Sequence, residues 1–421
     1  MIIDQRMSRK NILLEKADKS ASPSTAASLN HDENVKTWTD FVRVPYHPKS
    51  VASFSNIVHE DVVTKYLDGY LFAQTESFRD ELESKFRFSV EDCDRLQGFN
   101  VISDVHDAFS GISGSVLQYV RDECSKSAIV CYPVLPPQVM LQSKNDSVEE
   151  QNMKIQDKWR HSNHISNLTM SLCYFLDESD LVLPLTLLET LDKNCSVCFR
   201  EFRRINYKTS SLYHTSAILA SAVESSAVPW RVMNKSLTLS DLVAYMTEFQ
   251  RKIATCQIDF LMDNDFSIHF VPLLPEFCKL HSDRFARSIV SLQGANIFCR
   301  TPYDRDQTEE VGRKLESIFL DKRNLCYLTS DSQTLKPYYP SIFEGIGFSQ
   351  RTSDSVKSIT DPNIYLPVIT EIETSRKVEN FIDLLISSSN SSEIKRLKLN
   401  NDMSDYVAEI LQSTKKCYET A

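Results

Sequence analysis

The sequence predicts an α/β protein that contains a parallel sheet covered by helices. Phe99–Val105 is an apolar run rich in β-branched residues, which is typical of a buried strand. A turn-like stretch with Gly111 and Gly114 follows, then apolar residues at helical spacing over 116–124, and then a second apolar run, Ala128–Leu135. Strand, loop, helix and strand in this order form a βαβ unit, which implies a parallel sheet.

Length and composition limit the classes of protein that fit. The chain has 421 residues, of which 42% are hydrophobic and 25% charged, so a fully disordered chain is excluded and two or three domains are expected. Its net charge of −10 argues against a general nucleic-acid or anionic-membrane binder, since both need a positive face. Only 8 residues are glycine, few for a fold that holds phosphate on glycine-rich loops.

The remaining patterns predict elements in chain order. Residues 20–34 are small and polar, which indicates a flexible linker. The predicted elements are a strand end at Ile2–Asp4, an amphipathic helix over 76–96, an exposed polar insertion over 141–160, a helix over Ile165–Leu176, a buried segment over Leu181–Leu188, helices over Thr215–Glu224 and Leu237–Ile253, short strands over 258–305, a loop-rich region over 345–375 and a terminal helix from Met403 to Tyr418.

Neither a targeting segment, a membrane anchor nor a metal site is expected. Residues 1–20 carry acids and no apolar core, and no run approaches the roughly 18–20 apolar residues of a membrane span. We therefore expect a cytoplasmic protein without direct membrane insertion. The eleven cysteines are dispersed, and the pair Cys195 and Cys198 has no second pair to complete a zinc site. His161 and His164 are three residues apart but have no evident third ligand.

The segment His106–Ser115 is the one candidate binding site. It follows a strand and precedes a helix, where α/β proteins bind ligands and where backbone N–H groups and the helix dipole attract phosphate. An alternative is a capped turn in which a serine caps the helix, and the residues alone favour this second reading. The residues predicted for a phosphate loop are Asp107, Ser110, Gly111, Ser113, Gly114 and Ser115.

Several runs, in order along the chain, carry a family resemblance. They are Trp38–Val44 with His47–Ser50, Asp94–Gly111, Tyr213–Val223 with Val228–Arg231, and Asp405–Leu411 with Cys417 and Tyr418. These runs resemble the misato family, distant relatives of tubulin and FtsZ. The resemblance implies a tubulin-like fold in three parts: an N-terminal remnant and linker over 1–34, a degenerate nucleotide-binding α/β domain over 35–212, and an α+β domain over 213–421.

The resemblance also implies a role in mitochondrial distribution, morphology and inheritance. The expected partners are proteins of the mitochondrial surface, with tubulin or the cytosolic chaperonin as further ones, and the expected location is the cytoplasm with peripheral association to mitochondria. Two alternatives remain open: a GTP-binding tubulin-like protein, and a cytoskeletal or chaperonin-linked factor in spindle assembly and cell division.

Departures from the tubulin pattern predict that the chain is not an enzyme and holds no cofactor. The tubulin phosphate signature G-G-G-T-G-S-G corresponds here to Ala108–Gly114, so Ser110 and Gly111 match its Thr-Gly while Ala108 and Phe109 replace glycines. A carboxylate-bearing G-x-x-N-x-D loop is missing between residues 170 and 230. The first strand and its phosphate loop would precede Met1, so we expect a shortened form of the family chain.

Overall fold

The computed structural model describes residues 2–3, 47–53, 65–137, 150–192, 197–203, 205–231, 237–261, 268–279, 283–294, 323–329, 333–335, 339–340, 342–343, 364–389 and 401–419. The predicted linker over 20–34 and Cys195 of the cysteine pair lie outside these residues. The predicted strand end at the N-terminus is confirmed, because β1 (Ile2–Ile3) pairs in parallel with β2 (Ala52–Ser53).

Three parallel strands form the first sheet in the order β3 (Gly98–Asp104), β4 (Ala128–Val134) and β5 (Leu181–Val182). The register pairs all seven residues of β3 with β4, from Gly98 and Ala128 to Asp104 and Val134. The first six of the seven residues of the central strand β4 are buried, as expected for a parallel strand covered on both faces. The predicted βαβ unit is thereby confirmed.

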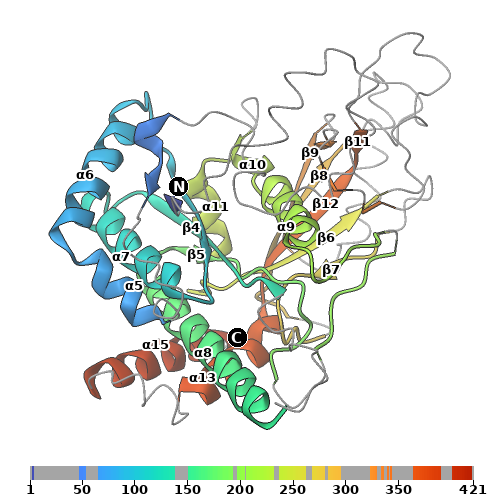
Figure 1. Cartoon of the computed structure of the whole chain (residues 1–421). Coiled ribbons are helices and arrows are strands. Elements are labelled where there is room, and N and C mark those ends of the chain that lie inside the picture. Colours follow the sequence, from blue (N-terminus) through green and yellow to red (C-terminus); the bar gives the residue numbers. More distant parts are fainter. Residues whose placement is uncertain are drawn as a thin grey trace, which may run out of the picture.

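Helices from both ends of the chain pack beside this sheet. The crossover helix α7 (Ala108–Glu123) contacts α5 (Tyr66–Ala73) and α8 (Glu150–Glu178). Two helices near the C-terminus, α13 (Glu379–Ser389) and α15 (Asn401–Glu419), pack against each other and against α8 (Figure 1). The end of the chain therefore contributes to the same hydrophobic core as α7 and β4.

A second, mixed sheet of five strands lies beyond residue 250. Its order is β7 (Val271–Pro272), β6 (Thr255–Phe260), β12 (Val368–Thr374), β8 (Arg287–Gln293) and β9 (Arg323–Thr329). The central strand β12 runs antiparallel to both β6 and β8, whereas β8 and β9 are parallel. Together with the parallel first sheet, this confirms an α/β half followed by an α+β half.

The remaining helices and strands complete the described part of the chain. They are η2 (Pro48–Ser50), α6 (Glu76–Glu91), α9 (Leu212–Ser226), α10 (Val228–Arg231), α11 (Leu239–Met246), β10 (Gln333–Leu335), β11 (Ile364–Leu366) and η5 (Arg376–Val378). Helix α9 lies across β6, β8 and β12 (Figure 1). The predicted helices over 76–96, Ile165–Leu176 and Thr215–Glu224, and the terminal helix, are confirmed. The division of the chain near residue 212 stays a prediction.

Three element predictions need correction. The predicted exposed insertion over 141–160 is helical from Glu150 onward, because α8 begins there, and residues 141–149 lie outside the described part of the chain. The helix predicted over Leu237–Ile253 ends at Met246. The region 345–375 is not loop-rich at its end, since Val368–Thr374 is the buried centre of the second sheet. This strand was not predicted because its two glutamates interrupt the apolar pattern. Both are buried with partners: Glu371 accepts a hydrogen bond from Gln257 at 3.0 Å, and Glu373 forms an ion pair with Lys377 at 2.6 Å.

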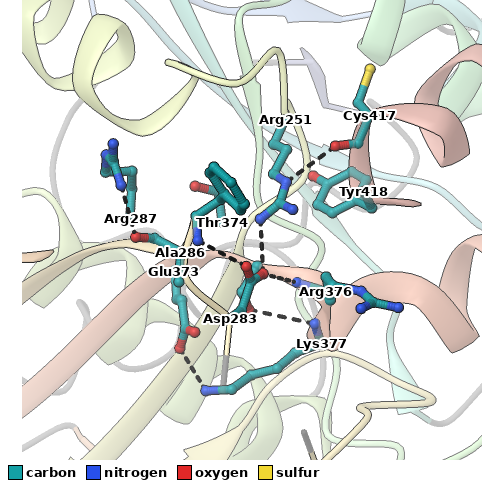
Figure 2. A network of polar contacts seen from close by, with 12 residues as sticks. Arg251, Asp283, Ala286, Arg287, Glu373, Thr374, Arg376, Lys377, Cys417 and Tyr418 are labelled. Atoms are coloured by element: carbon teal, nitrogen blue, oxygen red, sulfur yellow. Dashed lines mark hydrogen bonds and ion pairs between the residues drawn. The ribbon is translucent and has the colours of Figure 1, made fainter. Parts of the chain in front are cut away.

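A buried polar network joins α15 to the second sheet (Figure 2). Arg251, almost fully buried, forms an ion pair with Asp283 at 2.8 Å and donates from Nε to the carbonyl of Cys417 at 3.2 Å. Its guanidinium lies over the ring of Tyr418, 5.2 Å from the centroid. The Tyr418 hydroxyl donates to the carbonyl of Ile253 and accepts from its N–H. The last helical turn is therefore anchored through an arginine and a tyrosine.

Asp283 holds the centre of this network as a carboxylate. The backbone N–H of Arg376 donates to its Oδ2 at 2.9 Å and that of Phe285 to its Oδ1 at 3.0 Å. Burial raises the pKa of Asp283, but these two hydrogen bonds and the charge of Arg251 outweigh it and hold the pKa below its usual value. The network is therefore strongest while Asp283 is ionised.

None of the helices in the described residues is long and apolar enough to cross a membrane.

Candidate functional site

The predicted phosphate loop is the start of a helix. Residues 108–115 form the first two turns of α7, so a loop conformation over this stretch was wrong. Asp107 is the N-cap, and its Oδ1 accepts a hydrogen bond from the N–H of Phe109 at 2.8 Å. Aspartate is among the preferred N-cap residues because its carboxylate satisfies an otherwise unpaired N–H group. The alternative prediction of a side-chain cap at the start of the helix is therefore confirmed, but the capping residue is Asp107 and not a serine.

The glycines of this segment serve helix packing. A Cβ added at Gly111 would lie 2.0 Å from the carbonyl oxygen of Tyr66 and 2.6 Å from the N of Tyr70. A Cβ at Gly69 would lie 1.7 Å from the carbonyl oxygen of Ala108. Both contacts are with backbone atoms. The two helices α5 and α7 can therefore approach this closely only because both positions are glycine. Gly114 similarly makes room for the buried hydroxyl of Tyr66.

The serine hydroxyls of the segment are hydrogen-bonded within the protein. Ser110, fully buried, donates to the carbonyl of Asp107. The hydroxyl of Ser103 on β3 donates to that of Ser113 at 2.7 Å. The hydroxyl of Ser115 accepts from the side-chain amide of Gln74 at 3.1 Å. All six predicted residues thus lie in the N-cap and the first two turns of α7, the helix that follows β3, but the interactions described are with the protein itself. Phosphate binding there stays a prediction.

A cluster of titratable side chains lies beside this helix start. Asp104 ends β3, His106 follows in the connection, and Asp107 caps α7. Nδ1 of His106 is hydrogen-bonded to Oδ1 of Asp104, and its Nε2 lies 3.9 Å from Oδ2 of Asp107. One potential ligand atom from each of the three residues lies within 4.8 Å of the others. Both Asp104 and His106 belong to the run that carries the family resemblance. Sequence analysis placed His106 at the start of the candidate binding segment without naming it as a binding residue, and it assigned no role to Asp104.

Helix α8 fixes the backbone of His106. The ring of His164 donates from Nδ1 to the carbonyl of His106 at 2.9 Å, and the side-chain amide of Asn167 donates to the same carbonyl at 2.8 Å. The Asn167 oxygen in turn accepts from the N–H of Tyr66 at 2.9 Å. The rings of His106 and His164 lie 5.4 Å apart. His164, which the sequence singled out only for its spacing from His161, thus holds the backbone of a residue 58 positions away.

Burial and charge shift both pKa values in the cluster. Burial lowers the pKa of His106, but its hydrogen bond to Asp104 and the charges of Asp104 and Asp107 outweigh this effect, and the pKa is raised. Burial raises the pKa of Asp107 to about 6, although the charge of His106 and the N–H of Phe109 oppose the shift. At neutral pH Asp107 is mainly ionised, so the cluster presents negative charge at the N-terminus of α7.

Comparisons with known proteins agree with this architecture. Residues 26–232 match a family model described as a tubulin domain. Protein misato homolog 1 of Macaca fascicularis is 24% identical over 95% of this chain and 74% of its own length. Its counterpart in Homo sapiens gives the same identity and coverage, and Protein misato of Drosophila melanogaster is 26% identical over 52% of this chain and 36% of its own length. The tubulin domain, the parallel and mixed sheets and the matches along nearly the whole chain agree with the resemblance seen in the sequence, and over 95% of its length this chain is similar to the misato proteins.

Proposed function

We propose that this chain acts in mitochondrial distribution, morphology and inheritance as a non-catalytic tubulin-like protein that works through protein contacts. It acts from the cytoplasm and associates with mitochondria peripherally, by binding proteins of the mitochondrial surface. Similarity to the misato proteins, together with the tubulin-domain match, supports the mitochondrial part of the proposal. The structure of the degenerate phosphate loop supports the non-catalytic part.

The observation that carries the non-catalytic proposal is the position of Asp107. The N-terminus of a helix attracts anions through its N–H groups and dipole, and nucleotide-binding folds place a phosphate there. In this chain the protein's own carboxylate caps that end and accepts from Phe109 N–H. A phosphate approaching the same groups meets like charge: two unit charges 4 Å apart repel by roughly 4 kcal/mol at an effective dielectric constant of 20.

One observation favours GTP binding as a second candidate function. Ser110 and Gly111, which match the Thr-Gly of the tubulin signature, lie at the carboxyl end of β3 and the start of α7. This is where open α/β sheets bind ligands. For phosphate to bind there, the Asp107 side chain must leave the cap or be protonated.

Titration of the purified chain with a fluorescent GTP analogue in Mg²⁺, together with a phosphate-release assay, separates the two candidates. We expect neither saturable binding nor turnover. Asp107→Ser is the informative variant, because serine keeps the N-cap hydrogen bond and removes the charge. Binding by Asp107→Ser alone supports exclusion by charge, whereas specific Mg-GTP turnover by the unaltered chain overturns the non-catalytic proposal.

The cellular role is tested by depletion and rescue. Loss of the protein should disturb the distribution of mitochondria, and the unaltered chain and Ser110→Ala should restore it equally, since neither acts through nucleotide. An unchanged mitochondrial network after depletion contradicts the role. Co-purification with tubulin and the chaperonin, in place of mitochondrial surface proteins, would favour the chaperonin-linked alternative.

A further inference from the structure

We propose that Asp104, His106 and Asp107 form a binding site for one divalent transition-metal ion of the zinc type. An imidazole nitrogen and carboxylate oxygens are donors that zinc takes in proteins, and the nitrogen favours zinc over Mg²⁺, which prefers oxygen ligands. The site lies at the carboxyl end of β3. It is separate from the proposed mitochondrial role and does not depend on it.

The distances among the three side chains suit an ion. One potential ligand atom from each residue lies within 4.8 Å of the others. Two ligands of a tetrahedral zinc ion with bonds of about 2.0–2.2 Å lie roughly 3.4 Å apart. Nε2 of His106 and Oδ2 of Asp107 are 3.9 Å apart, so a shift of about half an ångström brings them to that separation.

The hydrogen bonds orient these donors. Asp104 accepts from Nδ1 of His106, which fixes the ring and leaves the lone pair of Nε2 directed toward Asp107. A carboxylate that holds the far nitrogen of a metal-binding histidine is a recurrent arrangement in zinc sites. Oδ1 of Asp107 is occupied by Phe109 N–H, and its Oδ2 faces His106. A metal-binding imidazole is neutral, so the ion takes the place of the second imidazole proton between Nε2 of His106 and Oδ2 of Asp107.

The surrounding structure holds the site in place but leaves it accessible. His164 and Asn167 both donate to the carbonyl of His106, so the backbone that carries the imidazole is fixed from α8. The side chains of Asp104, His106 and Asp107 are 35%, 21% and 27% exposed. An ion can therefore enter from solvent, and water can complete its coordination. In this arrangement His106 and Asp107 bind the ion, and Asp104 is a positioning residue.

Zinc binding to the full chain tests the proposal. The chelator-treated protein is titrated with ZnCl₂ by calorimetry, and bound zinc is counted by mass spectrometry after dialysis. We expect one equivalent at this site. His106→Gln and Asp107→Ser should each weaken zinc binding at least tenfold, and Asp104→Asn should weaken it by about tenfold because the ring loses its orientation. Asp107→Ser preserves the helix cap, so its loss of zinc does not reflect unfolding, which circular dichroism checks.

Two control variants separate this site from other zinc ligands in the chain. Cys198→Ser removes one thiol of the isolated cysteine pair, and His269→Gln removes an exposed imidazole elsewhere. Both should bind zinc like the unaltered chain. Substitution by Co²⁺ should give visible absorption without a thiolate charge-transfer band. Equal zinc uptake by the unaltered chain and by His106→Gln, or loss of zinc in Cys198→Ser alone, overturns the proposal.

Discussion

Replacing Gly111 with alanine distinguishes a packing glycine from a phosphate-loop glycine. The added Cβ would lie 2.0 Å from the carbonyl oxygen of Tyr66, and contacts under 3.0 Å force something to shift, so α5 must move by about 1 Å or more. Overpacking costs about 1–3 kcal/mol, and a backbone obstacle places this case near the upper end. Alanine regains about 1 kcal/mol of helix propensity. The net loss of stability is therefore about 2 kcal/mol.

Thermal and urea unfolding of the purified chain measure this loss. An unfolding entropy of about 2.1 cal/mol/K per residue over 421 residues corresponds to roughly 1 °C per kcal/mol, so the unfolding midpoint of Gly111→Ala should fall by about 2 °C. Ser84→Ala, on the exposed side of α6, is the matched control and should stay within about 0.5 kcal/mol of the unaltered chain. If Gly111→Ala is as stable as the unaltered chain, or more stable, the close approach of α5 and α7 does not explain this glycine. A change in GTP binding caused by Gly111→Ala would instead support the interpretation of this segment as a phosphate loop.

Three further changes test the rest of the structure. Tyr418→Phe leaves two buried backbone groups without their partner and should lower the free energy of unfolding by about 1–3 kcal/mol in urea titrations; an unaltered midpoint would show that α15 is not held there. The pKa of Asp283 is lowered in the folded protein, so this carboxylate contributes to the free energy of unfolding above about pH 4, and the contribution is lost as the pH falls through the folded pKa. Asp283→Asn is less stable because it loses the ion pair with Arg251, but its free energy of unfolding should fall less steeply on acidification than that of the unaltered chain. Burial raises the pKa of Cys131 to about 12, so the native chain should be alkylated at the exposed Cys93 and Cys326 before Cys131, and peptide mapping that finds Cys131 labelled as early would contradict this burial.

Local pattern predicted the first sheet well. The run that became β4 is continuous and apolar, and this strand is buried on both faces as predicted. The run that became β3 was also predicted to be a buried strand, but it is only partly buried, and its Ile102 is 63% exposed. The same reasoning failed at the start of α7, because glycine and serine are typical of turns. Here a glycine occupies position 111 within the helix because the opposing backbone of α5 leaves no room for a side chain. That constraint comes from a segment some forty residues upstream and has no signature in the local sequence.

The candidate site shows the same limit. Asp107 was predicted as a binding residue, and the structure gives it a structural role as the N-cap of α7 and a place beside His106. His164 was noticed only for its spacing from His161, because a single sequence does not reveal which residues of α8 face the connection after β3. A test for an aspartate before a glycine-containing helix would have found the cap.

The central position of β12 has a consequence for synthesis. Strands β6 and β8 are made early but pair with each other only through β12, which ends 114 residues after β6. At about 5–20 residues per second, the ribosome needs roughly 6–23 s to cover that distance. Over the last 81 residues of it, from the end of β8 at 293 to the end of β12 at 374, both β6 and β8 lack their shared partner, a condition that promotes aggregation. The second half of this protein is thus expected to fold after translation and to need protection on the way.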